Sequence, residues 1–352
     1  MAHLTANFTS EAALSPAVIE GIAAALSQGW ADPKKLSQAS HKALELKHAA
    51  LAEIAGHLGI SPNLMEVLGE PSLTHFIAIG GFLQPNKRFI YSAIDQGKIR
   101  ALAGSHSGES RVAPVTPDGR IEFPAAGISA DDVISIQGTN GETGVVQQLD
   151  IWRNHPGAVI LDATRTIPTA GLTAGFAAAT FDAAAWGGPA GIGFVVINES
   201  SKFRYPLPHI APIRVPGSYS LPLLVGSAIA LGEMAGKSAR IFSLRNYLSQ
   251  KLASIPKIRV VSHEQDHQSR YLSIVFDDFS GEEVLRALMK RGINTDSGSA
   301  CSPEDLAPSH VLAAMGYPTT GTLRLTLNAQ HAEEDIDLIT ADLRSVLESL
   351  HS

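Results

Sequence analysis

The chain has 352 residues, of which 45% are hydrophobic and 17% charged, and a formal net charge of −7. This length and composition exclude a disordered chain and predict about two domains with buried cores. The acidic balance gives no basic surface for nucleic acid. The longest nearly apolar stretch, residues 221–236, contains Glu233 and is shorter than the roughly 20 residues that a membrane span needs. The first residues lack a secretory signal pattern, so we expect a cytoplasmic protein with no nucleic-acid or membrane partner.

Strands and helices alternate along the sequence. Short apolar, β-branched runs predict strands at 132–136, 159–162, 193–197, 272–276 and 323–327. Apolar residues at helical spacing predict helices at 41–58, 282–291 and 334–350, and a long helical stretch at 221–254 that breaks near Gly236. Residues 100–119, with clusters of Gly, Ser and Pro, predict a loop. The alternation indicates an α/β fold with a mainly parallel sheet.

Cys301 is the one cysteine of the chain, so no disulfide can form within it. Taken alone, it is either a small buried hydrophobic residue or a reactive thiol. No grouping of side chains in the sequence predicts a metal site; His263 and His267 are four residues apart, but their polar surroundings are typical of a solvated loop.

The sequence around Cys301 points to a known family. Residues 296–303 read D-S-G-S-A-C-S-P, residues 308–312 read P-S-H-V-L, and residues 323–327 read L-R-L-T-L. This order resembles the cysteine desulfurases of the class V aminotransferase family. In that family the cysteine of the S-G-S-A-C-S segment is catalytic, and the later strand carries a substrate-binding arginine. The resemblance assigns these roles to Cys301 and Arg324.

The resemblance also implies an architecture and an assembly. The family has the pyridoxal-phosphate-dependent transferase fold of type I, in which a large domain with a mainly parallel central sheet flanked by helices carries a smaller α+β C-terminal domain. We expect the large domain at residues 13–240 and the small domain at residues 1–12 and 241–352. The family is homodimeric, so we expect a homodimer here.

Three positions resemble the family's substrate and ring contacts. Residues 140–145, N-G-E-T-G-V, resemble an N-N-E-x-G-x segment that places Asn140 beside the substrate and cofactor. Asp162 ends a strand where the family has the carboxylate that pairs with the pyridine nitrogen of pyridoxal phosphate. Arg165 stands where the family has a glutamine next to the ring oxygen. An alternative is that Arg165 forms an ion pair with Asp162 and fills the site.

The departures from the family lie where the cofactor chemistry should be. The segment G-P-A-G at residues 188–191 sets the register, and it places Ala185 at the Schiff-base lysine. Ala184 then takes the place of a phosphate-binding histidine, and Asp182 that of a phosphate-binding serine. A carboxylate at Asp182 would repel a phosphate a few ångströms away.

The remaining phosphate and ring contacts are also altered. The segment L-G-E-P-S-L at residues 68–73 replaces a T-S-G-A-T-E-like helix start, so Glu70 adds a negative charge and Pro71 removes a backbone donor. Ser72 is the remnant of this turn, Gln96 replaces the family's ring-stacking histidine, and Ser218 belongs to a loop that resembles R-S-G-T.

Together these residues predict a cysteine desulfurase-like pseudoenzyme, inactive or non-standard, in which binding of pyridoxal phosphate is weak or absent. The Cys301 loop would serve sulfur relay, or ligand or partner binding, and an authentic desulfurase or a sulfur-acceptor protein is a candidate partner. The alternative is an active pyridoxal-phosphate-dependent desulfurase, lyase or aminotransferase with an aberrant mode of cofactor binding.

Overall fold

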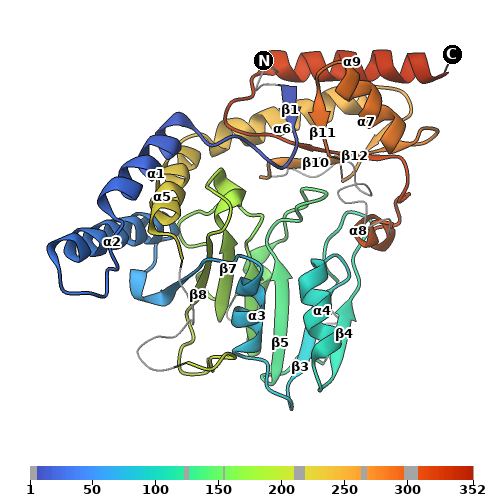
Figure 1. Cartoon of the computed structure of the whole chain (residues 1–352). Helices are drawn as coiled ribbons and strands as arrows, with labels where there is room; N and C mark the ends of the chain where they lie inside the picture. Colours follow the sequence, from blue (N-terminus) through green and yellow to red (C-terminus); the bar gives the residue numbers. More distant parts are fainter. Residues whose placement is uncertain are drawn as a thin grey trace.

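The computed structural model describes residues 6–122, 127–153, 155–209, 219–262, 268–296 and 308–351. These residues form a seven-stranded sheet, a three-stranded sheet and a two-stranded pair, with helices packed against them (Figure 1). Among the described helices, none is both long and apolar enough to span a bilayer.

The seven-stranded sheet has the order β2-β8-β7-β6-β5-β3-β4. Strand β8 runs antiparallel to both of its neighbours, and the other pairs are parallel. The predicted mainly parallel sheet is therefore confirmed. The strand bounds are Met65–Leu68 (β2), Arg88–Ser92 (β3), Ser110–Ala113 (β4), Asp132–Gln137 (β5), Ala158–Asp162 (β6), Ala178–Asp182 (β7) and Gly193–Ile197 (β8).

Both faces of this sheet are covered, as the continuous burial of its central strands requires. Within β6, Ile160 packs in the cluster that contains residues of α3 and α4, whereas Val159 and Leu161 pack in the cluster that contains residues of α2 and α5. The alternation follows from the two-residue period of a strand. The helices of this part are Pro16–Gln28 (α1), Gln38–Leu58 (α2), Leu73–Gly80 (α3), Gly97–Ser105 (α4) and Leu221–Ala235 (α5), with short 3-10 turns at Pro62–Leu64 (η2), Leu149–Trp152 (η3) and Ala183–Trp186 (η4).

The C-terminal part is a smaller α+β layer. Its antiparallel sheet has the order β12-β10-β9, and the short strands β1 and β11 pair in parallel beside it (Figure 1). The N-terminal strand thus joins the C-terminal part of the chain. The predicted domain limits at residues 12 and 240 stay a prediction. The bounds are Asn7–Phe8 (β1), Ser238–Ala253 (α6), Ile258–Val260 (β9), Tyr271–Phe276 (β10), Gly281–Lys290 (α7), Asn294–Thr295 (β11), His310–Ala314 (α8), Thr322–Thr326 (β12) and Glu333–His351 (α9).

The predicted elements agree with the structure except at residues 100–119. The predicted strands match β5, β6, β8, β10 and β12, and the break near Gly236 separates α5 from α6. The predicted loop is wrong in part, because α4 continues to Ser105 and β4 pairs with β3. Ile99 and Ala103 bury against the sheet, and this packing outweighs the poor helix propensity of the glycines around them.

Candidate functional site

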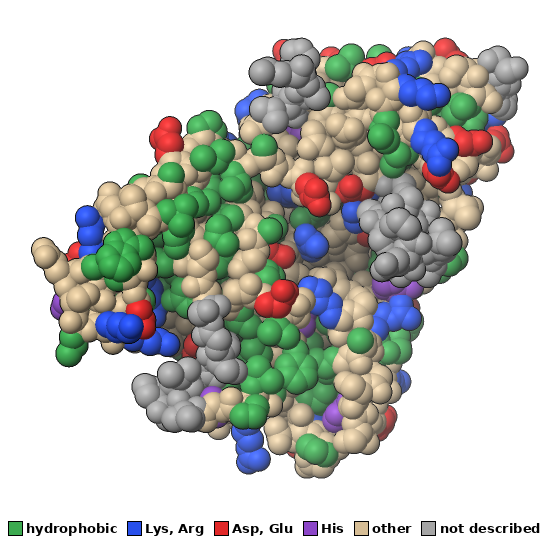
Figure 2. Space-filling model, in the orientation of Figure 1, with side chains coloured by type: hydrophobic (Ala, Val, Ile, Leu, Met, Phe, Trp, Pro, Cys, Tyr) green, Lys and Arg blue, Asp and Glu red, His purple; other side chains and the backbone are tan. Residues whose placement is uncertain are grey.

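The candidate site lies at the carboxyl ends of the parallel strands, the usual ligand-binding edge of such a sheet. A pocket of about 240 Å³ opens there, between the loops that follow β3, β5 and β6 and the strands β10 and β12. Figure 2 shows charged side chains in the hollow between the two parts of the molecule. The side chains that line the pocket include Gln96, Gln137, Glu142, Arg165, Tyr271 and Arg324.

Asp162 ends β6 and is buried in a closed polar cluster beside this pocket. His75 Nε2 lies 3.1 Å from its Oδ1. The Thr164 hydroxyl and the Thr164 N–H donate to the same oxygen at 2.6 and 3.0 Å, and Gln96 Nε2 donates to Oδ2 at 2.8 Å. Burial alone would raise the pKa of Asp162, but His75 and the Thr164 donors outweigh it and hold the pKa well below its usual range.

The cluster overturns the alternative of an Arg165–Asp162 ion pair and adds His75 to the site. Arg165 and Asp162 form no ion pair in the part of the chain that the structure describes, because His75 takes that place. His75 comes from α3, and its contact with Asp162 joins distant parts of the sequence. No local motif pointed to it.

The three residues at the family's lysine and phosphate positions form a short helix start. Asp182 Oδ1 accepts the N–H of Ala184 at 3.0 Å and caps the 3-10 turn η4. Ala185 is fully buried, and it belongs to the same hydrophobic cluster as Trp186. The structure therefore brings Asp182, Ala184 and Ala185 together at the end of β7, where they cap a turn and fill the core.

The start of α3 carries its own carboxylate. Glu70 Oε1 accepts the N–H of Ser72 at 2.9 Å, and hydrogen bonding from Ser72 lowers the pKa of Glu70. Free N–H groups at a helix start attract anions. Here the side chain of Glu70 already binds one of them, and Ser72 is exposed.

Asn140 lies in the pocket wall, and its amide holds its own turn together. Its Oδ1 accepts the N–H groups of Glu142 and Thr143 at 3.0 and 2.9 Å. Its Nδ2 donates to Gln137 Oε1 at 2.8 Å and to Ile94 O at 3.3 Å. The predicted contact of Asn140 with a substrate stays a prediction, since these bonds already engage both ends of the amide.

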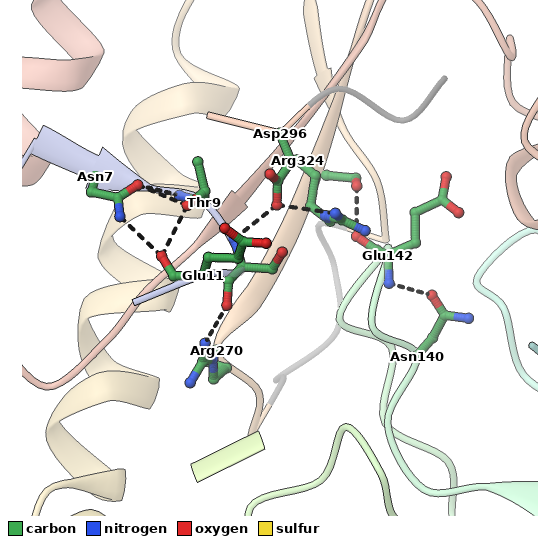
Figure 3. A network of polar contacts seen from close by, with 10 residues as sticks. Asn7, Thr9, Glu11, Asn140, Glu142, Arg270, Asp296 and Arg324 are labelled. Carbon is green, nitrogen blue, oxygen red and sulfur yellow. Dashed lines mark hydrogen bonds and ion pairs between the residues drawn. The ribbon is translucent and has the colours of Figure 1, made fainter. Parts of the chain in front are cut away.

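Arg324 on β12 forms an ion pair with the residue that follows β11. Its Nη2 donates to Asp296 Oδ2 at 3.0 Å, and the Ser10 N–H donates to the same oxygen at 2.8 Å (Figure 3). Arg270 Nη2 donates in turn to Ser10 O at 3.4 Å. The N-terminal segment is thus tied to the arginine that the sequence predicts as a substrate ligand.

Glu142 is a half-buried acid on the pocket wall. It lies within the segment at residues 140–145, but the sequence pattern assigned it no role. Ser309 Oγ donates to its Oε1 at 2.6 Å. Burial raises the pKa of Glu142, and Ser309, Arg324 and His310 only partly offset this effect. Glu142 therefore holds a proton more readily than an exposed glutamate.

Arg165 also lines the pocket. A Cβ atom at Gly141 would lie 2.8 Å from Arg165 Cγ, so the glycine makes room for this side chain. Burial lowers the pKa of Arg165, but nearby Tyr271, Asp182 and Asp162 outweigh burial and raise it, so the guanidinium stays charged. Cys301 and Ser218, the other two predicted site residues, lie outside the described residues.

Comparison with known proteins decides the family. The model of the family "Aminotransferase class-V" matches residues 214–339. A cysteine desulfurase of Klebsiella pneumoniae is 27% identical over 99% of this chain and 94% of its own length, and one of Sinorhizobium fredii is 30% identical over 67% of this chain and 66% of its own. The chain is a cysteine desulfurase homologue of the aminotransferase class V family. Family membership implies a pyridoxal phosphate cofactor.

Solved structures agree with the fold of this cysteine desulfurase homologue. A NifS-like protein superposes with a TM-score of 0.85 at 20% identity, over 97% of this chain and 99% of its own. A NifS-like protein from Rickettsia africae gives a TM-score of 0.82 at 19% identity, over the same shares. The predicted type I transferase fold is confirmed.

Proposed function

We propose that this cysteine desulfurase homologue is a pseudoenzyme that does not run the pyridoxal-phosphate reaction and keeps the pocket as a ligand-binding site. The observation that carries the proposal is the Asp162 cluster. In the family an aspartate at this place pairs with the pyridine nitrogen. Here Thr164 and Gln96 donate to the two carboxylate oxygens, and the imidazole of His75 lies 3.1 Å from one of them.

The described residues do not fit the phosphorylated pyridine in three further ways. Ala185 offers no amine for a Schiff base, and its side chain belongs to the core. Glu70 binds a backbone donor at the start of α3. Asp182 adds a second carboxylate near the place of the phosphate. A carboxylate beside a bound phosphate repels it.

We expect the purified protein to be colourless and to stay so when pyridoxal phosphate is added. Absorbance spectroscopy and sulfide release from free cysteine measure this, with an active cysteine desulfurase as the positive control. Ala185→Lys alone is expected to leave the protein colourless, because Asp162 keeps its partners. An aldimine band in the unmodified protein, with sulfide formed at an ordinary enzymatic rate, would rule the proposal out.

A sulfur-relay role for Cys301 is part of this proposal. The thiolate would attack the outer sulfur of a desulfurase persulfide, so that Cys301 becomes the persulfide and the donor cysteine leaves as thiolate. Mass spectrometry after incubation with a persulfidated desulfurase should show one added sulfur atom. Cys301→Ser should remove that gain, and an unmodified Cys301 in the intact protein would contradict the relay.

The predicted homodimer is also part of the proposal, and exposed hydrophobic residues support it. Three large hydrophobic residues are more than half exposed on or just after α1: Ile19, Leu26 and Trp30. Figure 2 shows hydrophobic side chains gathered along that side of the molecule. A second copy of the chain would cover them. Light scattering that gives the mass of a single chain at high concentration would exclude the dimer.

A further inference from the structure

We infer that Arg165, and not Arg324, is the anion-binding residue of the pocket, and that its ligand is a small carboxylate. This inference rests on the proposed function, because it treats the pocket as a binding site without a phosphorylated cofactor. Both arginines line the pocket, and the ligand's carboxylate binds the one whose guanidinium N–H groups are available to donate to it.

Arg324 is already paired with a carboxylate from the chain itself. Its Nη2 lies 3.0 Å from Asp296 Oδ2, and the side chains of the pair are only 19% and 15% exposed. Water screens such a pair weakly, so it is stronger than a surface ion pair. The Ser10 N–H also donates to Asp296 Oδ2, at 2.8 Å. A ligand at Arg324 would have to displace a carboxylate that two donors hold.

Arg165 presents its charge to the pocket without such a pair. Within the described ranges it has no ion pair at 4 Å or less, and its side chain passes Gly141 on the pocket wall. Its guanidinium stays positively charged, since Tyr271, Asp182 and Asp162 raise its pKa. A planar guanidinium binds a carboxylate through two parallel hydrogen bonds, and this geometry is selective for planar oxyanions.

The surroundings favour a single negative charge on the ligand. Asp182 and Asp162 lie close enough to Arg165 to influence its titration, and they would repel a phosphate dianion more than a carboxylate. Glu142 on the same pocket wall would likewise repel a dianion more than a monoanion. The volume of about 240 Å³ accommodates a small molecule.

Acetate is the probe for this inference, and saturation-transfer NMR at constant ionic strength gives its dissociation constant. We expect Arg165→Gln to weaken acetate binding by about tenfold or more, as the loss of a charge-assisted hydrogen bond does. Gly141→Ala should weaken it as well, because the new methyl group displaces the Arg165 side chain while the charge remains. The matched control is the double variant Arg324→Gln/Asp296→Asn, which removes the ion pair without changing the net charge and should stay within about threefold of the wild type.

Two outcomes would overturn the inference: no acetate binding by the wild type, or a large loss in the Arg324→Gln/Asp296→Asn variant with none in Arg165→Gln. Circular dichroism and thermal unfolding show whether each variant is folded, and Gly141→Ala keeps the test open if Arg165→Gln does not fold. Absorbance of the same samples with pyridoxal phosphate tests the proposed function separately. A coloured protein overturns that function, whereas the acetate constants decide between the two arginines.

Discussion

His75→Leu is expected to lower the free energy of unfolding by about 3 kcal/mol at pH 7, because it leaves Asp162 buried without its imidazole partner. The side chains of His75 and Asp162 are each only 2% exposed, so water cannot replace the lost contact. Thr164 and Gln96 still donate to the carboxylate, which keeps the loss at the lower end of the range for broken buried pairs. Urea unfolding followed by circular dichroism measures the change.

The pH dependence identifies the cause of this loss. The folded pKa of Asp162 is depressed, so its contribution to stability is present above its unfolded pKa of about 3.9 and disappears as the pH falls through the folded value. Without His75 the folded pKa of Asp162 rises, so the part of the deficit that comes from Asp162 should shrink as the pH falls below that raised value.

A double-mutant cycle with Asp162→Asn provides the control. Asparagine removes the buried charge, so His75→Leu/Asp162→Asn should lose less stability than the two single changes added together. Strict additivity would show that the imidazole and the carboxylate do not interact in solution.

The family motifs predict residues that act within one local segment. Asp162 ends a predicted strand, and the Cys301 segment and Arg324 belong to continuous motifs. Their order along the chain is therefore enough to propose them as site residues. The fold was predictable for the same reason. Alternating strands and helices of the right length leave few other arrangements.

Partners from other segments could not be predicted in this way. His75 reaches Asp162 from α3, and Ser10 and Arg324 meet at Asp296 because β1 pairs with β11. Neither contact follows from spacing along the chain. These contacts change the interpretation of the site, because they supply from within the protein the groups that a ligand was expected to bring.

Asn140 differs from its predicted role in another way. Its motif was recognised, and it does lie in the pocket wall. Sequence position could not show that its amide binds Glu142, Thr143 and Gln137 within one turn. A motif identifies where a side chain stands, and only its hydrogen bonds show whether its polar atoms are available.

Asp95→Asn is expected to stabilise the protein at neutral pH. Asp95 follows β3, is completely buried, and accepts the Ser92 N–H at 2.8 Å. Burial raises its pKa to about 8, and the negative charge of Asp162 adds to this, while the Ser92 hydrogen bond opposes it. The folded protein therefore keeps a proton on Asp95 that the unfolded chain releases above about pH 4. This difference lowers the free energy of unfolding progressively as the pH rises from about 4 to about 8.

Asparagine has no such proton, so the advantage of Asp95→Asn should grow by about 1.4 kcal/mol per pH unit and reach at most about 4 kcal/mol at pH 7. Urea unfolding at pH 5, 6 and 7 measures this slope. Asp132→Asn is the matched control of opposite sign. Burial would raise the pKa of Asp132, but hydrogen bonds from Arg88 and Ser129 outweigh it and lower the pKa, so this variant should lose stability at neutral pH.

An advantage of Asp95→Asn that stays constant between pH 5 and pH 7 would mean that Asp95 is already ionised in the folded protein. The sign of the slope also bears on the site. A protonated Asp95 keeps a second buried negative charge away from Asp162, and its backbone carbonyl accepts His310 Nε2 at 2.9 Å. A neutral Asp95 thus adds no negative charge beside Asp162. Ionisation of Asp95 at alkaline pH should therefore destabilise the cluster around Asp162.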